Sequence, residues 1–220
     1  MLKQTGQTRL LAGCAGFAAV LAHIIDFEKN EPQTIEYGKN MLIVSGSINA
    51  VSTEQLKMAK KRGITGFVLT PEQKLGFGYA DSPACGRFVD DIMHKLSAGG
   101  AAYIAAAEND NDIDACNRRA ASYNMDAEQI RAAVADNIGA IVKKTAETGA
   151  MDNLFVFGGD TLSGIVKQLN ITRLYPAAEI CPGAVVSITP AYPFNIITKS
   201  GGLGPPDVCL LAADKLNREG

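Results

Sequence analysis

The stretch NLFVFGGDT, residues 153–161, decides the fold. Its apolar run, 154–157, has the length of a strand and passes directly into two glycines. A helical pattern then begins at Leu162, so the stretch predicts a strand–turn–helix unit. The run lacks apolar–polar alternation, which is typical of a strand covered on both faces.

Similar units recur from residue 41 onward, which is the pattern of stacked β–α units. They predict a three-layer, Rossmann-like α/β domain around a mostly parallel or mixed sheet, with one helix appended at the N-terminus. A surface loop is expected at 71–83, and a solvated acidic loop at 108–114, which resembles a calcium loop but lacks its glycine and distal glutamate. The expected strands are 41–45, 66–70, 101–106, 153–157, 184–188 and 195–198, and the expected helices are 52–62, 84–98, 126–148, 162–169 and 207–217.

Composition excludes several classes of protein. The chain has 220 residues, enough for one large domain plus an appendage, and 47% are hydrophobic, which excludes intrinsic disorder. The net charge is −2 and the longest basic run is 60–62, which argues against a duplex-DNA binder. Five scattered cysteines without CxxC spacing, and two histidines, argue against a structural zinc site and a secreted disulfide scaffold. We therefore expect a cytoplasmic protein.

The N-terminal segment predicts a buried or docking helix at residues 10–25. Its apolar residues recur at helical spacing, and the segment is shorter than the roughly 20 residues needed to span a bilayer. A targeting segment is the alternative, although the apolar run follows the cysteine of the lipobox-like LAGC instead of preceding it. Residues 28–40 are polar, contain Pro32 and Gly38, and predict a linker. The apolar stripe consists of Leu10, Cys14, Phe17, Leu21 and Ile24.

Three glycine-containing turns follow predicted strands, where ligands of open α/β sheets bind. In the first turn, 45–49, backbone N–H groups and the Ser47 hydroxyl are suited to hold a phosphate or a ribose. The alternative is an ordinary strand–helix turn in which Ser52 caps the helix.

The second turn is Gly158-Gly159-Asp160-Thr161, and its glycines allow the backbone to approach an anion at a helix N-terminus. Thr161 adds a hydroxyl donor. A carboxylate beside a phosphate is unfavourable, so Asp160 indicates either a bound Mg²⁺ or a cap that points away. The alternative is a capped tight turn. Valine at position 158 should abolish nucleotide binding and leave the fold intact, provided that Gly158 does not adopt a positive φ.

The third turn begins at Lys199 and contains Gly201 and Gly202. Lys199 at a strand end is expected to supply a point charge for a phosphate. The alternative is a flexible connection with a solvated lysine. No Walker A loop or dinucleotide fingerprint accompanies these turns, so a nicotinamide enzyme is disfavoured.

The order of the motifs over 41–217 is similar to that of the C-terminal nucleotide-binding domain of four-carbon acid sugar kinases. The resemblance implies an ATP- and Mg²⁺-dependent kinase that phosphorylates a hydroxyl of a tetronate-type sugar acid. It also implies that Ser47, Gly158–Thr161 and the Gly201–Gly202 loop contact ATP. The motifs are VSGS at 44–47 with Ser52 and Gln55, FVFGGDT at 155–161, EICPG at 179–183 and ITKSGGLG at 197–204.

The family's N-terminal domain, which carries the sugar-acid site and the expected catalytic carboxylate, has no counterpart here. We therefore expect residues 41–220 to form the nucleotide-binding domain and 1–27 to resemble the closing helix of that other domain. The chain should bind adenine nucleotide and be inactive without the sugar-acid-binding domain or chain. No catalytic residue or metal ligand is assigned, and a homo-oligomer is compatible with the sequence. The alternative is a non-catalytic interaction module, or one that binds a phosphorylated metabolite.

Overall fold

The computed structural model describes residues 11–25 and 35–219. The chain divides into two compact units, Met1–Gln33 and Thr34–Gly220. In the first unit, helix α1 (Ala15–Ile24) occupies most of the segment for which a helix was predicted. Leu10 of the predicted stripe and residues 28–34 of the predicted linker lie outside the described residues.

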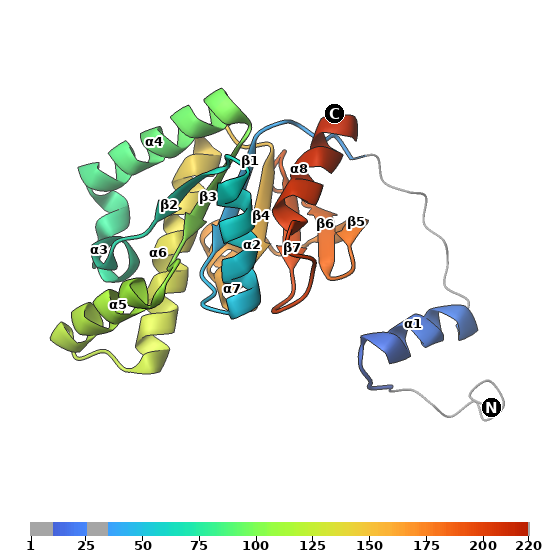
Figure 1. Ribbon diagram of the computed structural model, residues 1–220, viewed down its shortest axis with the longest axis horizontal. Helices are drawn as coiled ribbons and strands as arrows, with labels where there is room; N and C mark the ends of the chain where they lie inside the picture. The colour runs from blue at the N-terminus through green and yellow to red at the C-terminus, as the bar shows by residue number, and fades with distance from the viewer. Residues whose placement is uncertain (1–10, 26–34, 220) are drawn as a thin grey trace. The chain divides into compact units, whose positions relative to one another are not determined.

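A seven-stranded sheet forms the centre of the second unit, in the order β2-β3-β1-β4-β7-β6-β5 (Figure 1). The first five of these strands are parallel, and β6 runs antiparallel to both of its neighbours. The sheet is therefore mostly parallel with a mixed edge, as the sequence predicted. The strands are β1 (Met41–Ser45), β2 (Thr65–Val68), β3 (Ala101–Ala105), β4 (Asn153–Phe157), β5 (Tyr175–Cys181), β6 (Ala184–Ile188) and β7 (Asn195–Lys199).

Helices cover both faces of the sheet and complete the predicted three layers (Figure 1). Helices α2 (Ala50–Lys61) and α8 (Val208–Glu219) pack on one face, and α4 (Pro83–Gly99), α6 (Ala127–Glu147) and α7 (Gly159–Gln168) pack on the other. Alternation along β1 divides the core accordingly. Leu42 and Val44 enter the α4–α6–α7 core, whereas Met41 and Ile43 enter the α2–α8 core.

Four elements were not predicted from the sequence. Residues 71–83 form α3 (Pro71–Leu75) and the 3-10 helix η2 (Tyr79–Asp81), because Thr70 and Gln73 make a capping box ahead of a proline at the first helical position. The acidic stretch begins α5 (Asp110–Ser122), since carboxylates in a first turn favour the helix dipole. β5, which contains Pro176, was not predicted; it is an edge strand, where proline is tolerated.

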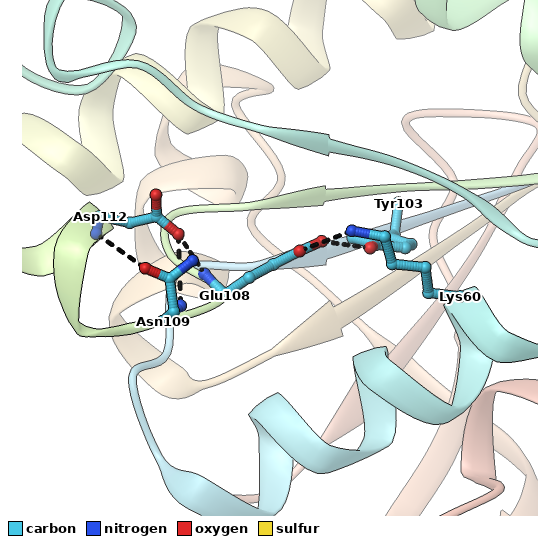
Figure 2. A network of polar contacts seen from close by, with 5 residues as sticks. All are labelled: Lys60, Tyr103, Glu108, Asn109 and Asp112. Carbon is cyan, nitrogen blue, oxygen red and sulfur yellow. Dashed lines mark hydrogen bonds and ion pairs between the residues drawn. The ribbon is translucent and has the colours of Figure 1, made fainter.

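A polar network fixes the connection between β3 and α5 (Figure 2). The Tyr103 hydroxyl donates to Glu108, whose other carboxylate oxygen lies 2.8 Å from Lys60 Nζ on α2. The Glu108 and Asn109 amides donate to the Asp112 carboxylate, which closes the capping box of α5. The start of α5 is thereby tied both to the sheet and to α2.

Small residues bring α6 and α7 into close contact. A Cβ added at Gly164 would lie 2.3 Å from the Ala135 carbonyl oxygen, and one at Gly139 would lie 2.5 Å from the Gly164 carbonyl oxygen. Only glycine allows this backbone approach. The middle of α7 is therefore held against α6.

Part of the predicted linker belongs to the second unit, which begins at Thr34. The Asn153 side chain donates to the Gly38 carbonyl at 2.8 Å, and the Asn195 side chain donates to the Glu36 carbonyl at 2.9 Å. The Asn40 amide donates to the Asp152 carboxylate at 2.9 Å. Residues 36–40 are thus bonded to the amino ends of β4 and β7.

Candidate nucleotide site

The three glycine-containing turns lie side by side at one edge of the sheet. They follow β1, β4 and β7, which are adjacent and parallel, and their last residues, Ser45, Phe157 and Lys199, are register partners. The turns leave the sheet at the same level, at the carboxyl edge where open α/β sheets bind ligands. The turns are far apart in the sequence, and the strand order brings them together.

Thr161 joins the first two turns. Its Oγ1 accepts a hydrogen bond from the Gly46 amide at 3.1 Å, and its side chain is buried. A Cβ at Gly46 would lie 2.4 Å from this oxygen. Since a hydroxyl that accepts a bond keeps its own proton, Thr161 can still donate to a ligand.

The second turn leaves a helix N-terminus without a side-chain cap. Gly158 is the N-cap of α7, with φ of 97° and ψ of 146°, and no side chain accepts from the first-turn amides. Side chains cap α2, α3, α4, α5 and α6. Gly159 and Asp160 are exposed, and a Cβ at Gly159 meets nothing within 4 Å. Uncapped amides and the helix dipole make this turn suitable for an anion.

Gly158 adopts a positive φ, so the condition under which valine at this position was expected to leave the fold intact is not met. A valine at this position would strain the backbone as well as block a ligand. Gly159 lies in the same turn and has no positive φ, so a substitution there changes access alone.

Lys199 is buried inside the protein. The sequence had instead predicted a charge at the end of the strand that is available to a phosphate. The side chain is 3% exposed, and Nζ donates to Ser52 Oγ at 3.1 Å and to the Gly201 carbonyl. The ammonium also lies 4.8 Å from the centre of the Phe157 ring. Burial lowers the pKa of Lys199. The Lys199 ammonium thus binds the third turn from inside the protein. A direct contact between Lys199 and a phosphate stays a prediction.

Ser52 and Gln55 bind the third turn and do not cap α2. The cap of α2 is Asn49, which accepts from the Val51 amide at 2.9 Å, so the prediction of Ser52 as cap was wrong. Gln55 is fully buried, and its Nε2 lies 3.0–3.2 Å from the carbonyls of residues 203–205. Gly201 and Gly202 stay exposed above these contacts.

A cavity of about 520 Å³ opens beside the first two turns. Three predicted site residues line it, namely Ser47 on the first turn and Asp160 and Thr161 on the second. The remaining wall comes from α3, α5, α6 and the residues after β3. Its volume lies within the range of small-molecule sites.

Lys74 and Arg131 also line this cavity, and neither was predicted as a site residue from the sequence. Lys74 lies on α3, in the segment expected to be a loop, and Arg131 lies on a predicted helix without a distinguishing motif. Lys74 is 2% exposed, and its Nζ donates to the Ala106 carbonyl at 2.8 Å and to the Asp112 carbonyl at 3.3 Å. Burial lowers the pKa of its ammonium.

Among residues 11–25 and 35–219, no group of three His, Cys, Asp or Glu side chains could hold a metal ion. Asp160 is the acidic residue in the first turn of α7, and it is exposed. Mg²⁺ commonly takes one or two carboxylates and completes its shell with water and substrate phosphates. The donor set therefore fits a Mg²⁺ ion that arrives with a nucleotide.

An open, mostly parallel α/β sheet with glycine turns at its carboxyl edge defines a nucleotide-binding class of domain. Residues 42–209 match the family described as the nucleotide-binding C-terminal domain, which covers most of the chain. The chain belongs to this family, the C-terminal domain of four-carbon acid sugar kinases.

Comparison with individual proteins agrees with the family. The chain is 23% identical over 184 residues to D-erythronate kinase of Heliobacterium modesticaldum, covering 81% of this chain and 42% of that protein. The chain thus spans less than half the length of this relative.

Solved structures share the fold. A Haemophilus influenzae protein of the family DUF1537 superposes with a TM-score of 0.68 at 19% identity, over 91% of this chain and 45% of that one. A domain of unknown function from Bordetella bronchiseptica, a domain-swapped dimer with bound citrate, has a TM-score of 0.60 at 19% identity, over 82% and 40% of the two chains. No helix in the described part of the present chain is long and apolar enough to cross a membrane.

Proposed function

We propose that the chain is the ATP-binding half of a kinase that phosphorylates a hydroxyl of a four-carbon sugar acid. The uncapped N-terminus of α7 beside the cavity carries this proposal. Its amides and the Thr161 hydroxyl would bind phosphate oxygens, and Ser47 would bind from the first turn. Bound Mg²⁺ would neutralise phosphate charge, with Asp160 as the protein ligand within reach.

The third turn would close over the phosphates. Gly201 and Gly202 are exposed at the strand end next to the second turn, and Lys199 and Gln55 hold their loop from inside. Lys199 would act on the nucleotide through this loop. Its buried ammonium also adds positive charge beneath the site.

A kinase also requires an acceptor pocket and a group that positions the acceptor hydroxyl. We propose that a sugar-acid-binding domain or chain supplies both. Residues 1–27 would belong to that domain, 28–40 would connect it, and 41–220 would bind the nucleotide. The chain alone should bind Mg-ATP without phosphorylating a four-carbon sugar acid such as D-erythronate. Rapid, acceptor-dependent ATP consumption by the purified chain would contradict this division of labour.

Nucleotide binding is tested with the Gly159→Val variant. The valine side chain enters open space at the start of α7, so it should block ligand approach without disturbing the core. We expect the affinity for Mg-ATP, measured by calorimetry, to fall at least about tenfold, equivalent to about 1.4 kcal/mol. Mg-ATP should also raise the melting temperature of the unmodified chain by mass action.

The matched control is Gly86→Val. Gly86 is an exposed glycine of α4 without positive φ, and a Cβ there also meets nothing within 4 Å. It does not line the cavity beside the turns. This variant should bind Mg-ATP like the unmodified chain. Equal affinity in the Gly159→Val variant would show that the assigned turn is wrong.

A further inference from the structure

We infer that the cavity between α5 and α6 is the subsite for the nucleotide base, which sets the direction in which the nucleotide lies across the sheet. This inference rests on the proposed function and deepens it. The evidence is the chemistry of the cavity wall, the strand order and one buried lysine.

The cavity wall combines polar and apolar groups. The Ser47 hydroxyl lines it after β1, and Asp160 and Thr161 line it at the uncapped start of α7. Apolar side chains of α5 and α6, together with Ala106 and Ala107 after β3, form another part of the wall, to which Lys74 and Arg131 also contribute. An aromatic base can bury its ring surface against the apolar side chains. The apolar residues are Ile113, Cys116, Ile130 and Val134.

The strand order then gives the orientation. The carboxyl ends of the strands follow one another as β3, β1, β4 and β7. The cavity includes residues after the first three, and none of Lys199, Gly201 and Gly202 lines it. With the base on the β3 side, the α- and β-phosphates lie at the first and second turns. The terminal phosphate then points toward the third turn, on the β7 side.

Lys74 gives the base subsite its polar contact. Its ammonium has three N–H donors, and the contacts to the Ala106 and Asp112 carbonyls use two of them. The residue lines the cavity although its side chain is buried. The third donor matches an acceptor on the base, such as a purine ring nitrogen. Lys74 is therefore a positioning residue for the base, remote from the transferred phosphate.

A tryptophan reporter tests the location of the base. The chain contains no tryptophan, so the Asn117→Trp variant carries a single indole at an exposed position of α5 that lines the cavity. Adenosine and Mg-ATP should change its emission because the base comes to lie beside the ring. Inorganic tripolyphosphate should leave the emission unchanged. The matched control is Tyr175→Trp, an exposed position on the edge strand β5, which should respond to none of the three.

A second variant, Lys74→Met, tests the polar contact and keeps most of the side-chain length. Calorimetry should show adenosine affinity lowered about tenfold, the loss expected for one hydrogen bond to a charged donor. Affinity for tripolyphosphate should change less than twofold. A purely structural role for Lys74 would weaken both probes together and would overturn its assignment. Should this variant not fold, the Asn117→Trp reporter decides the location alone.

The outcomes separate the base subsite from the proposed function. In one outcome, Mg-ATP binds and Gly159→Val abolishes that binding, but adenosine and Mg-ATP leave the emission of the Asn117→Trp variant unchanged. This outcome overturns the base subsite, and the proposed function stands. If neither Mg-ATP nor tripolyphosphate binds the unmodified chain, the proposed function fails and the inference fails with it. The inference is supported if adenosine and Mg-ATP both change the emission and tripolyphosphate does not.

Discussion

Replacing Gln55 by glutamate should destabilise the third turn in a pH-dependent manner. The Gln55 Nε2 group donates into the carbonyls of Leu203, Gly204 and Pro205 from a fully buried position on α2. A carboxylate in its place has no proton to donate and faces three partial negative charges. Glutamine and glutamate are nearly isosteric, so the substitution changes the chemistry without creating a cavity.

The magnitude follows from these contacts. Two N–H donors are lost, at about 1 kcal/mol each, and an ionised buried carboxylate adds at least about 1–2 kcal/mol. The expected loss in the free energy of unfolding is therefore about 3–4 kcal/mol at pH 8. Burial raises the pKa of such a carboxyl in the folded state, so the penalty is present at high pH and relieved as pH falls through that pKa. The Gln55→Leu variant should lose less, about 1–2 kcal/mol, because it also removes the buried, unpartnered Oε1.

Urea denaturation followed by circular dichroism at pH 5 and pH 8 measures these losses. Gln168→Glu, at a half-buried position at the end of α7, controls for the added charge and should show a much smaller difference between the two pH values. A Gln55→Glu variant as stable as the unmodified chain at pH 8 would refute the reasoning. In that case Gln55 would not hold the third turn.

Three further perturbations test the packing around the site. Gly164→Ala forces a Cβ to within 2.3 Å of the Ala135 carbonyl oxygen, so calorimetry should show a lower melting temperature and a loss of about 2 kcal/mol. Thr161→Val leaves the Gly46 amide without its acceptor and should cost about 1–2 kcal/mol in urea denaturation, whereas Thr161→Ser should cost less than half of that. Burial raises the pKa of Tyr103, so the stability due to its neutral form is complete below pH 10 and is lost as pH rises above it. The chain should lose stability above pH 10 more steeply than its Tyr103→Phe variant, as judged by alkaline denaturation curves.

The second turn illustrates how far sequence reasoning reached. An apolar run, two glycines and a helical pattern are neighbours in the chain, so their local preferences predict a strand, a turn and a helix without knowledge of the rest. The positive φ of Gly158 and the missing cap of α7 are consequences of that same local sequence.

The burial of Lys199 could not be predicted from the sequence. Its position at a strand end was correct, but local sequence does not state which face of the sheet a side chain enters or what covers it. The register with Phe157 and the contact with Ser52 put the ammonium beneath its own loop. Lys74 was missed for a related reason: its segment contains glycine and proline, and the short α3 depends on a cap and on packing against α5 and α6.

Sequence alone therefore determined the alternation of strands and helices, the glycine turns that follow the strands and the family to which the chain belongs. These properties depend on residues that are close together in the chain. Only the tertiary structure decided which turns meet, which lysines are buried and where the cavity opens. Strand order and helix packing set these features through contacts between residues that are far apart in the chain. A local sequence pattern does not indicate which distant residues will meet.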